Sequence, residues 1–223
     1  SSGTIVLEEV PKTMYSLCDN GIRINIYGES STKITMGNNI IAVTQHTGYP
    51  FSEKIVISID PEKEESFDVD IRIPEWLKDS IIVLDGKETI VKRNSFHRIS
   101  RKWKRGDSIA IVFPFSIRLE TKTEAYNQRG EFTDIISEYI ALYNGPLLYG
   151  TEWADEYKNR KPLCVPSSVS VSDFKKIPAP SGSLGDAYEI NVNDTAFVFV
   201  PFYQVGSRKD NIYRTVWMKK TKI

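Results

Sequence analysis

The chain has few of the residues from which catalytic and metal sites are most often built. Its 223 residues include only two histidines and two cysteines. Cys18 and Cys164 stand far apart, outside any Cys-x-x-Cys or Cys/His spacing, which argues against a zinc site built within this chain. We interpret both as mostly buried thiols, and nothing in their spacing signals a disulfide.

The chain also lacks net charge, because 29 basic residues balance 29 acidic residues. A neutral chain has no long-range field that would gather polyanions, which argues against nucleic acid and anionic membrane surfaces as partners. A neutral sugar polymer is compatible with this balance. No apolar run approaches the ~20 residues that a membrane-spanning helix needs. The sequence leaves the compartment open.

The first residues lack the charged and apolar regions of a signal peptide. Because the chain opens on Ser-Ser-Gly-Thr rather than on Met, we expect an excised fragment or a processed product. Residues 1–18 are predicted to form a short helical stub, since apolar side chains recur there at roughly helical spacing. These apolar residues are Ile5, Val6, Val10 and Met14.

From Gly21 onward, apolar residues alternate with polar ones, as in half-buried strands. Phe67 to Ile73 illustrates the pattern, because its apolar residues fall on one face and its charged residues on the other. Hairpin signals such as Gly37-Asn38-Asn39 and Asp85-Gly86 recur between the strands. The predicted fold is therefore all-β, with two antiparallel, jelly-roll-like β-sandwich domains after the stub.

The first predicted sandwich covers residues 19–118 and the second covers residues 119–223. Residues 120–137 are polar and rich in turn-forming residues, which favours a domain boundary there. Residues 162–185 are rich in proline, serine and glycine, and are predicted to form a long loop.

No catalytic constellation stands out. Acid–base hydrolysis by paired carboxylates requires two acids in a fixed geometry, and Asp134 and Glu138 are four residues apart in a segment where nothing fixes it. His46 and His97 lie in strand patterns, where a lone histidine is more often structural than catalytic. A nucleophile elbow, a phosphate loop and a dinucleotide fingerprint are all missing. We therefore predict no catalytic residue and no metal ligand in this chain.

Tryptophan is the residue type best suited to binding in this sequence, because aromatic faces stack on the C–H faces of sugars at little entropic cost. Trp76, Trp103 and Trp217 fall at strand ends or within strand patterns, and are predicted to pack in the core. Trp153 and Tyr157 lie in an irregular stretch and are the candidates for carbohydrate binding.

Several short phrases occur in an order and spacing typical of one family. They are Tyr49-Pro50, Arg72 to Trp76, Trp103 to Asp107, Gly145 to Tyr149, Val200 to Tyr203 and Tyr213 to Trp217. Together they resemble the region that follows the catalytic barrel in the DUF1680 family, the glycoside hydrolase 127-type β-L-arabinofuranosidases. The resemblance covers most of the chain and is weakest over residues 151–194.

The resemblance implies that the chemistry lies upstream of this chain. In the family, a glutamate and cysteines near the end of an (α/α)-barrel bind zinc, and one cysteine is the proposed nucleophile. Ser2-Gly3-Thr4 resembles the tail of the family's Cys-Cys-Ser-Gly-Thr phrase, with Ser1 where a cysteine is expected. Cys18 and Cys164 do not align with that cysteine doublet. The resemblance therefore implies no cofactor in this chain and zinc in the upstream domain.

Three functions follow as alternatives. The first is the non-catalytic part of an arabinofuranosidase-like glycosidase, inactive alone, which supports the upstream barrel and contacts a second copy through a sheet edge. Its parent would act on a plant-type or other arabinose-containing glycan, and apolar surface would be exposed around Ile5, Val6 and Val10. The second is an autonomous carbohydrate-binding module that uses Trp153 and Tyr157. The third is a structural or adhesive β-sandwich without a ligand.

Overall fold

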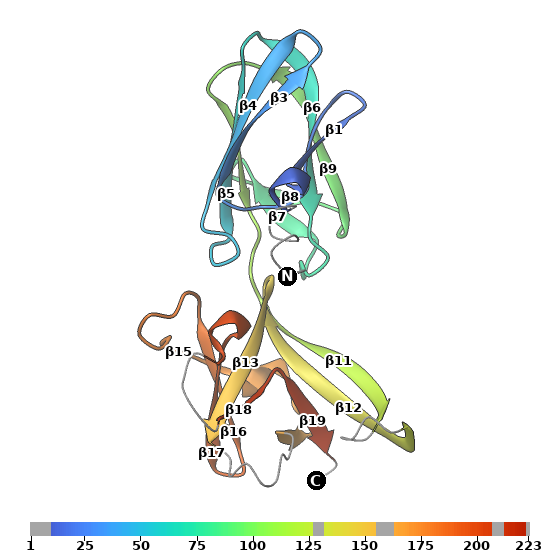
Figure 1. Ribbon diagram of the computed structural model, residues 1–223, viewed down its shortest axis with the longest axis vertical. Coiled ribbons are helices and arrows are strands. Elements are labelled where there is room, and N and C mark those ends of the chain that lie inside the picture. Colours follow the sequence, from blue (N-terminus) through green and yellow to red (C-terminus); the bar gives the residue numbers. More distant parts are fainter. Residues whose placement is uncertain (1–9, 127–131, 155–162, 207–211, 222–223) are drawn as a thin grey trace, which may run out of the picture. The chain divides into compact units, whose positions relative to one another are not determined.

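The computed structural model describes residues 10–126, 132–154, 163–206 and 212–221 (Figure 1). Most of these residues lie in strands and turns, which confirms the predicted all-β fold. Contacts divide the chain into two compact units, Ser1–Phe115 and Ser116–Ile223. Among the described residues, no helix is long and apolar enough to cross a membrane.

The first unit consists of two sheets. The smaller sheet has the order β1-β2-β6-β9, with strands Tyr15–Cys18, Gly21–Ile24, Glu65–Ile73 and Ser95–Trp103. The larger sheet has the order β3-β4-β5-β10-β7-β8, with strands Ser30–Met36, Asn39–Thr47, Lys54–Pro61, Asp107–Val112, Ile81–Leu84 and Lys87–Ile90. All pairs are antiparallel except β2 and β6, which run parallel.

The core of this unit lies between the two sheets. Ile22 and Val69 from the smaller sheet pack in one cluster with Ile57 and Ile109 from the larger sheet, and all four are fully buried. Burying an aliphatic side chain of this size contributes about 1.5–3 kcal/mol. Trp103 is also fully buried, as predicted, and its indole Nε1 donates to the backbone oxygen of Phe67 over 2.8 Å.

Of the predicted N-terminal helix, the described residues include one helical turn at residues 10–13. Its extension over residues 15–18 is wrong, because Tyr15–Cys18 is strand β1 and pairs antiparallel with β2. A short isolated helix gains little, whereas pairing with β2 satisfies the backbone of this segment. Val10 is 39% exposed, in line with the expected apolar surface, while Ile5 and Val6 lie outside the described residues.

The second unit is built on one sheet path that β13 (Leu147–Ala154) divides into two parts. On one side the order is β14-β19-β12-β13, with β14 at Cys164–Pro166, β19 at Trp217–Thr221 and β12 at Phe132–Asn144. On the other side the order is β13-β17-β16-β15, with Thr195–Pro201, Ala187–Val192 and Lys175–Ile177. The two parts share one buried core, which includes Ile140, Met218, Tyr149 and Phe199.

Three further elements complete this unit. Strand β11 (Ile117–Tyr126) pairs with β12, and β18 (Ile212–Thr215) pairs with β13. Two short 3-10 turns, η1 (Val171–Asp173) and η2 (Phe202–Gln204), follow β14 and β17 in the chain.

The described residues of the polar segment 120–137 lie in strands, where the sequence predicted a boundary. It contributes to the long hairpin of β11 and β12, in which Thr121 pairs with Ile140. Ile117 and Arg118 also pair with β12, and therefore lie in the second unit rather than at the end of the first. The predicted loop at residues 162–185 likewise contains β14 and β15.

Candidate functional site

A groove of about 560 Å³ lies in the second unit, over the outer face of strands β13 and β17. Val198 and Val200 of β17 and Glu152 of β13 form its floor. The loop at residues 180–184 and the side chains of Tyr203 and Gln204 in η2 form its walls. These lining segments are separated in sequence and meet only in the folded unit.

Strand alternation explains why these residues line a surface groove rather than the core. In β17, Phe199 points inward and is fully buried, so its neighbours Val198 and Val200 face the other way. In β13, Thr151 is fully buried and Glu152 takes the opposite face. The outer face of the sheet therefore combines two short aliphatic side chains with one carboxylate.

Gly150 allows the segment after η2 to approach the sheet closely. A Cβ atom at this position would lie 3.0 Å from Val205 Cγ2 and 3.1 Å from the backbone oxygen of Thr215. Both distances are shorter than ordinary van der Waals contacts. The glycine thus helps to hold the wall that carries Tyr203 and Gln204 against the floor.

The walls are joined by a chain of hydrogen bonds. Tyr203 Oη donates to the backbone oxygen of Leu184 over 2.9 Å, and Gln204 Nε2 donates to Tyr203 Oη over 2.8 Å. The Tyr203 side chain is therefore held in place although the residue is 53% exposed. Gln204 Oε1 is buried and has no hydrogen-bond partner within the described part of the chain.

The charge of the groove floor is balanced locally. The Glu152 carboxylate accepts a hydrogen bond from the backbone N–H of Gly206, and Arg214 Nε lies 3.6 Å from Glu152 Oε1. The floor consequently offers polar atoms without an uncompensated negative charge.

The two predicted carbohydrate-binding residues are only partly located by the structure. Trp153 lies in β13, where its backbone pairs with Tyr213, but its side chain is outside the described residues. Tyr157 is outside them altogether. Their part in binding stays a prediction. In the sequence, Val200 to Tyr203 stood out only as part of the family resemblance, although an aromatic pair directly after a strand-ending proline could have signalled an exposed site.

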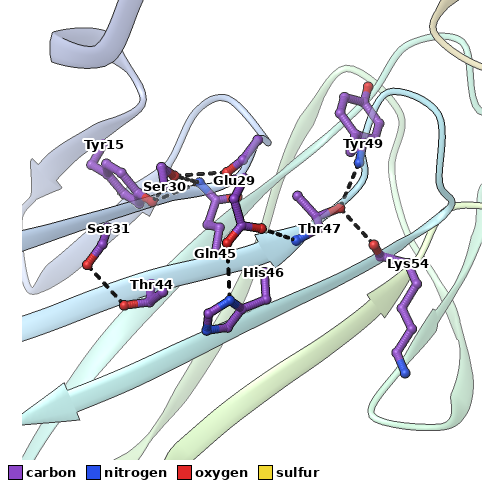
Figure 2. Close-up of polar contacts among 11 residues, drawn as sticks. Tyr15, Glu29, Ser30, Ser31, Thr44, Gln45, His46, Thr47, Tyr49 and Lys54 are labelled. Carbon is purple, nitrogen blue, oxygen red and sulfur yellow. Dashed lines mark hydrogen bonds and ion pairs between the residues drawn. The ribbon is translucent and has the colours of Figure 1, made fainter. Parts of the chain in front are cut away.

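In the first unit, the acids with clear roles support structure rather than acid catalysis. The Asp70 carboxylate accepts hydrogen bonds from Arg98 and Arg23, and these guanidinium groups hold its pKa below the ordinary value against the opposing effect of burial. The Glu29 carboxylate accepts the Thr47 N–H and contacts His46 Nδ1 at 3.2 Å (Figure 2), and its pKa is lowered mainly by that amide. A general acid needs a raised pKa, whereas the pKa values of Asp70 and Glu29 are both lowered.

Among the described residues, the remaining candidates for chemistry do not come together in one site. Glu138 forms an ion pair with Lys220 at 2.8 Å, whereas the side chain of Asp134 lies outside the described residues. Cys18 and Cys164 are half-buried and do not form a disulfide. Within the described residues, no cluster of three or more histidine, cysteine, aspartate or glutamate side chains could hold a metal ion.

Comparison with solved structures reveals proteins of the same fold. A protein titled a glycoside hydrolase matches with a TM-score of 0.66 at 22% identity, over 92% of this chain and 36% of its own. A GH127 β-L-arabinofuranosidase from Geobacillus stearothermophilus T6 matches with a TM-score of 0.70 at 17% identity, over 99% of this chain and 37% of its own. A further GH127 β-arabinofuranosidase matches with a TM-score of 0.63 at 19% identity, over 95% of this chain and 37% of its own.

The chain therefore spans little more than a third of the length of these solved proteins. A search of curated protein sequences found no match. Two family models, however, match successive parts of the chain. Residues 21–115 match the model described as "Beta-L-arabinofuranosidase, GH127 middle domain", and residues 132–219 match "Glycoside hydrolase family 127 C-terminal domain". With both structural units matched in order, the chain belongs to glycoside hydrolase family 127 and carries the middle and C-terminal domains of that family.

Proposed function

We propose that this chain is the non-catalytic β-sandwich portion of an arabinofuranosidase-like glycoside hydrolase, and that it supports a catalytic barrel upstream. The supporting observation is the coverage of the solved relatives. They match 92–99% of this chain, yet only 36–37% of their own length. Two of them are titled β-arabinofuranosidases, and most of each lies outside the matched region.

Glycoside hydrolysis commonly needs two carboxylic acids on either side of one bond, one of which is protonated at working pH. The acids with perturbed pKa values in the described residues are Glu29, Glu64 and Asp70, and all three are shifted downward. In this proposal the catalytic residues, and the zinc ion that the family resemblance implies, belong to the upstream barrel. An arabinose-containing glycan is the substrate of the parent enzyme.

Hydrolysis of p-nitrophenyl β-L-arabinofuranoside tests this proposal. We expect the 223-residue chain alone to release no nitrophenol above the buffer rate, and the longer parent protein to release it readily. A parent protein without the region equivalent to residues 21–219 should have a lower melting temperature and a lower soluble yield. Hydrolysis by the chain alone would refute the proposal, as would full stability and activity of the shortened parent.

A further inference from the structure

We propose that the groove of the second unit binds a neutral saccharide. This inference goes beyond the proposed function, because a β-sandwich that supports a barrel needs no ligand of its own. The groove lies between β13, β17, η2 and the loop at residues 180–184, away from the core that Tyr149 and Phe199 fill. Its volume of about 560 Å³ falls within the ~300–1,000 Å³ typical of small-molecule sites.

The aromatic side chain of Tyr203 at the wall of the groove suits a sugar ring. Tyr203 is half exposed, and its hydroxyl is held by Leu184 and Gln204, so little conformational freedom is left to lose on binding. A fixed aromatic ring beside aliphatic Val198 and Val200 suits the apolar C–H face of a sugar.

Polar groups of Gln204 and two serines add hydrogen-bonding capacity to the groove. A buried acceptor without a donor is unfavourable, and Gln204 Oε1 has none among the residues that the structure describes. Gln204 lines the groove next to Ser181 and Ser183, which add hydroxyl groups to the opposite wall. A sugar hydroxyl is both a donor and an acceptor, so it could bond to the two serine hydroxyls, and it would reach Gln204 Oε1 only after the amide turns towards the groove.

The charge of the groove favours neutral over acidic saccharides. Glu152 is the one charged side chain among the described residues that line the groove, and Arg214 and the Gly206 N–H already compensate it. A uronic acid or a phosphorylated sugar would bring a negative charge towards this carboxylate without gaining a free cation in return. A neutral pentose or hexose oligosaccharide avoids that cost.

Calorimetric titration of the 223-residue chain with arabinan oligosaccharides and xylotriose, and with oligogalacturonate as the charged counterpart, tests the inference. We expect the neutral oligosaccharides to bind in the millimolar to micromolar range and oligogalacturonate to bind at least about tenfold more weakly. Absence of binding by every neutral oligosaccharide at millimolar concentration would overturn the proposal. Equal or tighter binding of oligogalacturonate would overturn the assignment to neutral sugars.

Variants of neighbouring residues locate the binding site. Tyr203→Ala should weaken binding about tenfold or more, whereas Tyr203→Phe should retain most of the affinity because the ring remains. Phe202→Ala is the matched control, since Phe202 is 51% exposed in the same turn but does not line the groove. If Phe202→Ala weakens binding as much as Tyr203→Ala does, or if Tyr203→Ala has no effect, the groove is not the site.

Saccharide binding and the proposed supporting role can fail separately. Lack of binding leaves the hydrolysis and stability results of the longer parent protein unchanged. Conversely, hydrolysis by the chain alone would refute the supporting role without affecting whether the Tyr203 groove holds a sugar.

Discussion

Asp70 and Arg98 lie directly opposite each other on β6 and β9 and share two hydrogen bonds. Arg98 Nε donates to Asp70 Oδ1 over 2.8 Å, and Arg98 Nη2 donates to Oδ2 over 3.1 Å. Arg23 of β2 donates to Oδ2 from the other side over 3.2 Å. Although Asp70 lies on the outer face of the sheet, it is only 2% exposed, because the two arginines cover it. The carboxylate therefore joins three adjacent strands.

Replacing the Asp70 carboxylate should make the free energy of unfolding less dependent on pH in the acidic range. Hydrogen bonds from Arg98 and then Arg23 lower the pKa of Asp70 below 3.8, so its stabilisation is present above the unfolded-state pKa and is lost as pH falls through the folded-state pKa. Asp70→Asn should lower the free energy of unfolding by about 1–2 kcal/mol at pH 7. Urea titrations should show this difference shrinking below about pH 4.

Glu64→Gln is the matched control for Asp70→Asn. Glu64 forms an ion pair with Lys102 at 2.8 Å, but both side chains are exposed, and an exposed pair of this kind contributes little. The urea midpoint of this variant should equal that of the wild type at pH 7. A loss as large as that of Asp70→Asn would show that burial does not distinguish the two carboxylates.

Gly21→Ala should destabilise the first unit strongly. Strand β2 runs parallel to β6 with Gly21 opposite Asp68, and an added Cβ would lie 1.9 Å from the Asp68 backbone oxygen. Since backbone cannot move aside cheaply, we expect a loss of about 3 kcal/mol in the free energy of unfolding. Gly28→Ala is the control, because its Cβ would meet only Met14 Cε at an ordinary 3.5 Å. Similar melting temperatures for both variants would contradict this account.

The pKa of Glu29 should stay low without its histidine neighbour. The Thr47 N–H is the largest cause of the lowering below 4.5, ahead of both contributions from His46. Carbon-13 NMR titration of the Glu29 carboxyl group should give a pKa below 4.5 in the wild type and in His46→Ala. A return to 4.5 in the variant would assign the shift to the imidazole instead.

The alternation of apolar and polar residues from Gly21 onward was enough to predict an all-β first unit and the buried face of β6, but β1 was wrongly predicted as helix. The alternation did not predict the burial of Asp70, because strand period says which face a residue takes but not which side chains from neighbouring strands cover it. It also missed the hairpin of β11 and β12, in which exposed residues such as Glu120, Thr121 and Thr123 make both faces polar. Polar strands resemble loops when only hydrophobicity is read.

The groove was beyond the reach of sequence patterns for a related reason. Tyr203 bonds to Leu184 across 19 residues, and the Gly206 amide reaches Glu152 across 54. Such contacts depend on the strand order of the second unit, which the sequence does not specify locally. Trp153 drew attention to β13 because of its residue type, whereas Gln204 carries no signal of its own until the fold buries its amide oxygen.

A hydrogen-bond network around Gln45 links β1 of one sheet to β3 and β4 of the other (Figure 2). Gln45 is fully buried, and its Nε2 donates to Tyr15 Oη over 3.0 Å and to the Ile26 backbone oxygen over 3.1 Å. Tyr15 Oη also bonds to Ser30 Oγ at 2.7 Å. One phenol oxygen therefore holds the N-terminal strand to the larger sheet.

Tyr15→Phe keeps the ring but removes that oxygen, so it should lower the free energy of unfolding by about 1–2 kcal/mol. Hydrogen exchange should quicken first at the amides of β1, because this strand loses its side-chain tie to the larger sheet. Ser31→Ala is the control, since the hydroxyl of exposed Ser31 bonds to Thr44 at 3.1 Å within the larger sheet. If hydrogen exchange in β1 is unchanged by Tyr15→Phe, the backbone pairing with β2 is sufficient to hold this strand. The hydrogen bonds of the network would then only satisfy the buried amide of Gln45.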